Sequence, residues 1–199
     1  MRTAVRAALM LMVVLLVTGV AYPLVITAIA QGVFGDRADG SLVRVDGRVI
    51  GSTSIGQSWG GEGWFHGRPS AVGYDATTSG GSNLGPTSRN LADDVERRVR
   101  AILELEEPFV SGLRPEDVPA DLVTASASGL DPHISVSAAE LQAPRIAAVN
   151  GLSLEQVEQL IDEHTEPPTL GFLGQERVNV LQLNLALASI DPSSLGGVR

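Results

Sequence analysis

The sequence predicts a small α+β domain that follows a single membrane-spanning helix at the N-terminus. Three observations support this fold class: a long uncharged apolar run near the N-terminus, one segment in which apolar and polar residues alternate, and capping boxes that open helices further along the chain. A length of 199 residues allows one domain and an appendage.

The apolar run covers residues 7–31 and predicts a helix that crosses the membrane. No residue between Ala7 and Ala30 is charged, and about 20 apolar residues are enough to cross the hydrocarbon core. Pro23 lies inside the run, where a spanning helix tolerates it if a neighbouring group satisfies the freed carbonyl. A cleaved signal peptide is the alternative, because Ala28-Ile29-Ala30 resembles a cleavage site, but the apolar region of such a peptide usually covers only about 7–15 residues.

The charges that flank this run predict its orientation. Arg2 and Arg6 precede it, and the next charged residue is Asp36. The positive-inside rule therefore places residues 1–6 in the cytoplasm and residues 32–199 outside. We expect a single-pass protein of the cell (inner) membrane with an extracytoplasmic domain.

The domain begins with a hairpin and two glycine-rich regions. Residues 41–50 alternate valine with polar residues across Asp46-Gly47, which is typical of a hairpin. Residues 55–70 combine glycine with aromatic residues, so we expect one or two bulged strands there. Residues 73–88 are almost all small and polar, a composition typical of a flexible linker. A helix should then run from residue 87 or 88 to Glu107, because apolar residues recur at helical spacing.

The second half predicts more helix. Residues 118–134 are a small-residue stretch bounded by prolines. Ser137 to Glu140 form a capping-box pattern for a helix toward Gly151, which Pro144 should kink or shorten. A second capping box at residues 153–156 starts another helix. Residues 178–188 alternate like a strand but are rich in leucine and alanine, and we favour a helix there.

Composition and motifs give no catalytic residue and no metal site. The chain has no cysteine, which excludes a disulfide framework and thiolate ligands. Gly56-Gln57-Ser58-Trp59-Gly60 matches the G-x-S-x-G elbow of serine hydrolases, but further glycines follow it where the elbow needs a helix. The three histidines, His66, His133 and His164, are far apart and form no ligand pair.

The charge of the chain argues against nucleic-acid binding. The net charge is −9, and it becomes −11 once Arg2 and Arg6 are set aside. An acidic domain repels phosphate backbones. The glycine-rich residues 80–85 lack the lysine of a phosphate-binding loop, and the chain contains no lysine at all.

Several long motifs follow one another in a fixed order along nearly the whole chain. They are residues 66–71, 73–76, 79–86 and 118–135, then Gln142 with Arg145, and residues 164–166, 170–174 and 177–180. Together with the single N-terminal span, these motifs resemble the KdpC family, the C subunits of a bacterial high-affinity potassium importer driven by a P-type ATPase.

The resemblance implies a non-catalytic accessory subunit that has no cofactor of its own. Its implied partners are KdpA, which conducts potassium, KdpB, which hydrolyses ATP, and the small KdpF. The family is held to stabilise this KdpFABC assembly and to act as a catalytic chaperone that raises the ATP affinity of KdpB. Gln142 and Arg145 match the Q-x-x-R pair proposed to contact the nucleotide, so ATP would be shared with KdpB.

The polar loops of the resemblance suggest a docking role. Short runs of Ser, Asn, Thr and Gly satisfy their backbone groups locally and present hydrogen-bonding turns. We expect residues 73–86 and 123–135 to pack together over the extracellular mouth of KdpA, or else only to complete the fold of the domain. The residues expected to contact the partner are Tyr74, Asp75, Ser82, Asn83, Asp131 and His133.

Two other classes of function stay open from the sequence. One is a membrane-anchored extracytoplasmic binding or sensor domain, which would need a ligand pocket and no obligate partner. The other is a secreted hydrolase that uses Ser58, which would need a helix after Trp59 and a histidine within reach.

Overall fold

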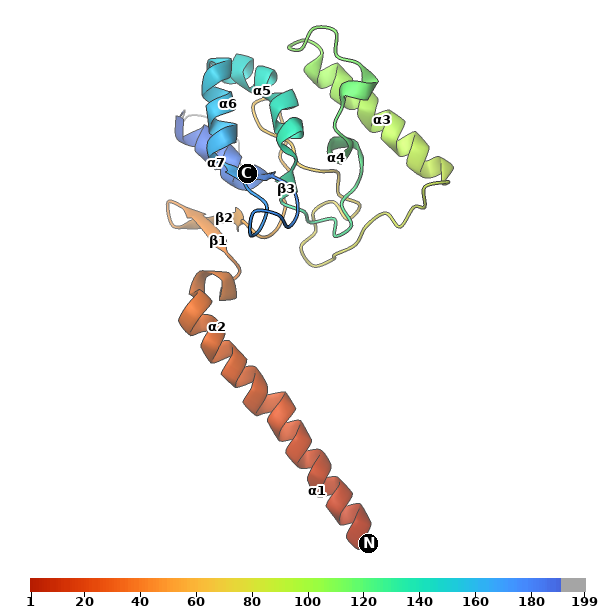
Figure 1. The fold of residues 1–199 in the computed structure, drawn as a ribbon, viewed down its shortest axis with the longest axis vertical. Helices are drawn as coiled ribbons and strands as arrows, with labels where there is room; N and C mark the ends of the chain where they lie inside the picture. Colours follow the sequence, from red (N-terminus) through yellow and green to blue (C-terminus); the bar gives the residue numbers. More distant parts are fainter. Residues whose placement is uncertain (191–199) are drawn as a thin grey trace. The chain divides into compact units, whose positions relative to one another are not determined.

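A computed structural model describes residues 1–190 and confirms the α+β fold class (Figure 1). The chain divides into two compact units, Met1–Ile50 and Gly51–Arg199. The end of the predicted extracytoplasmic domain, residues 191–199, lies outside the described residues.

The first unit consists mainly of one long apolar helical run, Arg2–Ala38. It comprises α1 (Arg2–Leu16), the π-helical turn η1 (Val17–Ala21) and α2 (Tyr22–Ala38). Its mean hydropathy reaches 2.6, and its length and composition suit a membrane-spanning helix. The run continues beyond the apolar stretch of residues 7–31 into the polar residues that follow.

A π-helical turn precedes the proline of this run. Pro23 lies in the first turn of α2 and has no N–H to donate to the preceding turn. The wider η1 turn lies directly N-terminal to it, and the hydroxyl of Thr18 donates to the carbonyl of Val14 at 2.7 Å. A π-turn is a common way to accommodate such an irregularity inside a helix.

The predicted hairpin is confirmed. β1 (Leu42–Val45) pairs with β2 (Arg48–Ser52). Asp46 and Gly47 form the turn with φ angles of 49° and 78°. Two successive positive φ angles are typical of the type I′ turn, whose twist matches that of the strands.

A small antiparallel sheet lies in the second unit. β5 (Arg177–Asn179) is its central strand, between β3 (His133–Ile134) and β4 (Thr165–Glu166). The register pairs Ile134 and Thr165 with Val178. β5 leads directly into α7 (Val180–Ile190), so the leucine-rich segment is a strand for residues 178–179 and the favoured helix from Val180 onward.

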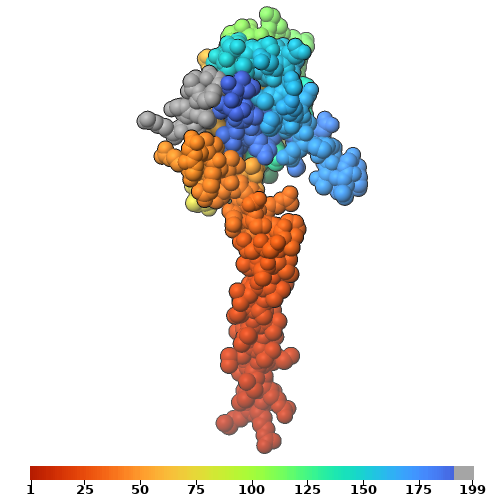
Figure 2. Space-filling model, turned by 90° about the vertical axis from the view of Figure 1, so that its left-hand side faces the viewer, coloured from red at the N-terminus to blue at the C-terminus, as the bar shows by residue number. Residues whose placement is uncertain are grey.

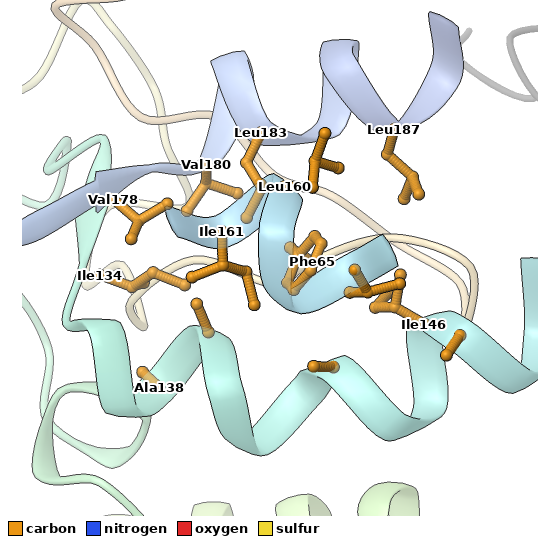
Figure 3. Close-up of a cluster of buried hydrophobic side chains, with 14 of the residues drawn as sticks. Phe65, Ile134, Ala138, Ile146, Leu160, Ile161, Val178, Val180, Leu183 and Leu187 are labelled. Atoms are coloured by element: carbon orange, nitrogen blue, oxygen red, sulfur yellow. The ribbon is translucent and has the colours of Figure 1, made fainter. Parts of the chain in front are cut away.

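The core of this unit lies among α5 (Val136–Asn150), α6 (Leu154–Glu163), α7 and the sheet. Alanine residues of α5 allow α6 to pack closely against it. Figure 3 shows how side chains from these elements converge on the ring of Phe65, which comes from an irregular segment. The buried side chains labelled there are Phe65, Ile134, Ala138, Ile146, Leu160, Ile161, Val178, Val180, Leu183 and Leu187.

The predicted helix at residues 87–107 is α3 (Arg89–Glu106), which packs against α5 and the short helix α4 (Ala120–Val123). A 3-10 turn, η2 (Pro115–Asp117), precedes α4. The guanidinium of Arg98 donates to the carbonyl of Val123 at 2.9 Å and ties α3 to α4. The only fully buried residue of α3 is Glu106.

One prediction about α5 is wrong, and the shortening considered for Pro144 does not occur. Its N-cap is Ser135, whose hydroxyl accepts from the N–H of Ala138 at 3.1 Å, so the helix begins before Ser137. Pro144 neither ends nor shortens the helix, which continues to Asn150 and is capped by Gly151 in the left-handed conformation. The carbonyl that loses its donor to Pro144 belongs to Glu140, and this residue is exposed to water.

The strands predicted within residues 55–70 are also wrong. Apart from one bridge between Ser52 and Ile55, this region is irregular. No helix follows Trp59 either, so Ser58 lacks the context of a nucleophile elbow.

Candidate functional site

Residues 62–66, here called the clamped segment, form an irregular chain between α5 and α7. The side-chain amide of Asn184 accepts from the N–H of Phe65 at 2.9 Å and donates to its carbonyl at 3.0 Å. The amide of Gln142 does the same for His66, at 2.7 and 3.2 Å. Two side-chain amides therefore satisfy the backbone groups that a neighbouring strand would satisfy in a sheet.

Arg145 completes the clamp from α5. Its Nη1 donates to the carbonyls of Trp64, at 3.1 Å, and Glu62. Its Nη2 donates to Gln142 Oε1 at 3.0 Å. Its Nε donates to Glu106 Oε1 at 2.9 Å, in an ion pair whose side chains are both fully buried.

Burial changes the protonation of two groups beside this clamp. It raises the pKa of Glu106, although the charge of Arg145 opposes the shift. Within the described residues, Glu106 Oε2 has no hydrogen-bond partner. Burial also lowers the pKa of His66. The hydrogen bond to the Gly61 carbonyl, at 2.9 Å, opposes this shift, and the charge of Arg145 adds to it.

A second feature is the set of polar loops that precede α3 and β3. The hydroxyl of Ser70 donates to the carbonyl of Gly129 at 2.6 Å and accepts from the N–H of Tyr74 at 2.9 Å. The N–H of Gly80 donates to the carbonyl of Ser128 at 2.8 Å. The predicted packing of residues 73–86 on residues 123–135 is therefore present at these contacts.

The loops approach most closely at Gly129. Its φ angle is 68°, and a Cβ atom there would lie 2.6 Å from the carbonyl oxygen of Gly80. Only glycine meets both conditions without strain.

A groove of about 470 Å³ lies between these loops and the sheet. Asp131 lines it and accepts from Arg68 Nη1 at 3.1 Å and from the His133 N–H at 3.0 Å. Burial disfavours the charged form of Asp131, but the hydrogen bonds of His133 and the charge of Arg68 leave its pKa below the ordinary value. The other charged residues that line the groove are Asp121, Glu176 and Arg177.

A chain of polar contacts leads from this groove to β4. The imidazole of His133 lies 3.6 Å from Asp131 and 3.8 Å from Glu166. Glu166 in turn accepts from Arg177 Nε at 2.9 Å, across β4 and β5. The carboxylates of Asp131 and Glu166 alternate with the imidazole of His133 and the guanidinium of Arg177, so the groove offers both donors and acceptors to a polar partner. No group of three His, Asp or Glu residues that could hold a metal ion occurs within residues 1–190.

The long apolar helix, the clamped segment and the polar loops all belong to the part of the chain that matches a known sequence family. Residues 4–189 match the sequence model described as KdpC: K+-transporting ATPase, c chain. The chain belongs to the KdpC family. Its relatives include the potassium-transporting ATPase KdpC subunits of Polaromonas naphthalenivorans, 51% identical over 99% of this chain and 100% of the relative, and Nitratidesulfovibrio vulgaris, 50% identical over 96% of each. The subunit of the same name in Mycobacterium tuberculosis is 50% identical over 94% of this chain and 97% of the relative.

The two residues expected from the KdpC resemblance to contact the nucleotide are buried inside the domain. Gln142 and Arg145 have 1% and 0% of their surface exposed. They lie one turn apart on α5 and bind each other and the clamped segment. A nucleotide would reach them only after the clamped segment had moved away, and their contact with ATP stays a prediction.

The six predicted docking residues fall into two groups. Tyr74, Asp131 and His133 are half-buried beside Arg68, and the hydroxyl of Tyr74 donates to the Arg68 carbonyl. Burial raises the pKa of this tyrosine, with a further contribution from Asp131.

The remaining three residues, Asp75, Ser82 and Asn83, are exposed. The carboxylate of Asp75 accepts from the N–H and hydroxyl of Thr77 at 2.9 and 2.7 Å, which lowers its pKa. Asn83 has a φ angle of 53°, a conformation that asparagine tolerates better than most residues.

Sequence reasoning missed Asn184 and Glu106 as parts of the clamp. A usable signal existed for Asn184, because it interrupts an otherwise apolar helical segment between Leu183 and Leu187. A polar residue on a buried helix face needs a hydrogen-bond partner. Glu106 carried no such signal, since Glu104 and Glu107 lie beside it and a run of carboxylates is typical of a helix face in solvent.

Proposed function

We propose that this chain is the accessory C subunit of an ATP-driven potassium importer and has no catalytic site of its own. The observation that carries the proposal is the family match over residues 4–189, which includes both the anchor helix and the whole described domain except its last residue. The relatives that support it are named as potassium-transporting ATPase subunits and match over almost their full length.

The proposed partners are the other subunits of the KdpFABC complex. KdpA would conduct potassium, KdpB would hydrolyse ATP, and KdpF would be the small third partner. The run Arg2–Ala38 would cross the membrane with Arg2 and Arg6 in the cytoplasm. The second unit would then lie outside, where it meets the extracellular parts of the partners.

We propose that the polar loops present a rigid docking surface to KdpA. The bonds between Ser70 and Gly129 and between Gly80 and Ser128 hold the loops together, so little backbone entropy is lost when a partner binds. This bracing leaves Asp75, Ser82 and Asn83 exposed at the surface. Asp131 and His133 would offer a charged groove beside them.

An effect on the ATP affinity of KdpB would then come through assembly. The guanidinium of Arg145 is engaged by Glu106, Gln142 and two carbonyls, which leaves it little capacity to bind a phosphate. ATP would remain a ligand of the complex, shared with KdpB. Direct contact through Gln142 and Arg145 is the competing proposal, and it requires the clamped segment to open.

The test is a mild-detergent pull-down of the tagged full-length chain from potassium-starved cells, followed by potassium-stimulated ATPase assays with and without this subunit. Recovery of KdpA and KdpB, with loss of activity when the chain is omitted, is the expected result. Purification of the chain alone, with a pump that works without it, would overturn the proposal. An anchored binding or sensor domain would then be favoured, and the groove would be its ligand site.

The docking surface has its own test within the same assay. An Asn83→Ala substitution removes an exposed amide without touching the buried clamp, and Thr87→Ala, at another exposed position, is the control. We expect weaker recovery of KdpA with the first variant only. Full assembly and potassium uptake with Asn83→Ala would remove the argument for docking through these loops.

A further inference from the structure

The segment between β4 and β5 ends in a preformed turn with apolar side chains. Residues 169–173, here called the apolar tip, close through two hydrogen bonds of 2.9 Å between Thr169 and Leu173. Leu170 and Gly171 at the bend have φ angles of 57° and 80°. The tip therefore satisfies its own backbone and needs no neighbouring element to hold its shape.

The large side chains of the apolar tip point into solvent. Leu170 is 80% exposed, Phe172 is 73% exposed and Leu173 is 52% exposed. Figure 2 shows this part of the chain, coloured for residues near 170, standing out from the surface of the second unit. Single exposed apolar residues are ordinary, but three in one rigid turn form a patch of the kind that marks an interaction site.

We propose that the apolar tip inserts into an apolar socket with a basic rim on another subunit of the transporter. This inference rests on the proposed function, because it requires the chain to assemble with such subunits. The tip is too small to be a whole interface, so it would act as the buried anchor of a larger contact. A rigid anchor loses little conformational entropy when it binds.

The charges near the tip favour a protein socket over the membrane surface. Acidic residues flank the tip along the chain, with Glu163 before it and Glu176 after it, and Arg177 is paired with Glu166 at 2.9 Å. Anionic lipid head groups attract basic segments and repel acidic ones. A basic rim on the partner would complement Glu163 and Glu176.

The same charges argue against a second copy of this chain. Each copy carries a net charge of −9 and would bring an identical acidic rim to the contact. A partner of different composition avoids this repulsion.

The position of the tip supports the same partner. The tip continues into Gln175, Glu176 and Arg177, which line the groove that also contains Asp131 and His133. A subunit that docks on the groove would therefore meet the apolar tip at its edge. The charged groove and the apolar tip would then belong to one interface.

The test compares two double substitutions in the full-length, tagged chain. Leu170→Ser with Phe172→Ser removes the tip, and Val149→Ser with Leu154→Ser removes two other exposed apolar side chains as a matched control. We expect the tip variant to recover about tenfold less of the other transporter subunits in a mild-detergent pull-down. The control should recover wild-type amounts, and both variants should unfold at the wild-type temperature, since none of the four side chains is buried.

A photo-crosslinking residue at position 172 identifies the occupant directly. An adduct with another transporter subunit is the expected result, and an adduct with a second copy or with lipid alone would overturn the proposal. The tip proposal also fails if the tip variant recovers as much of the transporter as the wild type. A wild-type chain that recovers no transporter subunit refutes the proposed function instead, so the two failures are distinguishable.

Discussion

The clamped segment and the apolar tip are both short, irregular and glycine-containing, yet they place their aromatic residues in opposite environments. Phe65 of the clamped segment is fully buried, whereas Phe172 of the apolar tip is 73% exposed. In the first, Asn184 and Gln142 supply the backbone hydrogen bonds from two helices. In the second, the turn supplies its own.

This difference indicates that the source of the backbone hydrogen bonds distinguishes a loop that belongs to the core from one that is exposed to solvent. A buried backbone must find partners for its N–H and C=O groups. Helix side chains provide them for residues 62–66, so this segment can enter the core with Phe65. The apolar tip is independent of the helices and can bind elsewhere without disturbing the domain.

The largest expected effect comes from breaking the buried ion pair of the clamp. Arg145→Met leaves the buried carboxyl group of Glu106 without its partner, and we expect a loss of about 3–5 kcal/mol in the free energy of unfolding. Urea titration of the full-length chain in detergent measures it. The control is Arg97→Met on α3, the helix that carries Glu106. It breaks a solvent-facing pair with Asp94 and should have little effect.

A double variant sharpens this prediction. Arg145→Met with Glu106→Leu removes both charges, so it should be more stable than Arg145→Met alone. Equal stability of the single and double variants would show that the ion pair does not hold the clamp.

The next effect tests the packing of the polar loops. Gly129→Ala combines a positive φ angle with a Cβ atom 2.6 Å from the Gly80 carbonyl oxygen, whereas Gly73→Ala has a φ angle of 63° and open space. We expect Gly73→Ala to cost about 1 kcal/mol and Gly129→Ala about 1–3 kcal/mol more, because overpacking adds to the backbone strain. Similar losses for the two variants would mean that the loops do not pack closely.

A third effect concerns the amide clamp itself. Asn184→Ala leaves the N–H and carbonyl of Phe65 buried without partners, at a cost of about 1–3 kcal/mol. Gln182→Ala is the control on the same helix, because its side chain is exposed. The prediction fails if Asn184→Ala unfolds at the same urea concentration as Gln182→Ala.

The smallest effect is the pH dependence of stability through His66. Its pKa is lowered in the folded chain, so the unfolded chain binds the proton at a higher pH. The stability from neutral His66 is therefore complete above about pH 6.5 and is lost as the pH falls toward the folded pKa.

Thermal unfolding at pH 7.5 and 5.5 tests this dependence. The unfolding temperature of the wild type should fall more than that of His66→Gln. Glu106 is present in both proteins, so its own titration contributes to both and cancels in the comparison. Identical pH dependence in the two proteins would contradict the role of His66.

The sequence by itself determined the features that depend on local chemistry. The uncharged run predicted the apolar helix, Asp46-Gly47 predicted the hairpin turn, and Ser153 with Gln156 predicted the capping box of α6, in which both reciprocal hydrogen bonds are present. Each of these depends on residues within one or two turns of each other, where propensity and capping are decisive.

Only the tertiary structure decided how residues 62–66 are held and where Gln142 and Arg145 point. His66 is bound by Gln142, 76 residues away, and Phe65 is bound by Asn184, 119 residues away. No local pattern in the sequence reveals partners at such a separation. The same packing keeps α5 continuous through Pro144, because the buried side chains on both sides of the proline hold the helix in place. Residues 62–66 lie in the region predicted as strand, but their long-range hydrogen bonds and the burial of Phe65 make them an irregular part of the core. Both depend on the completed fold.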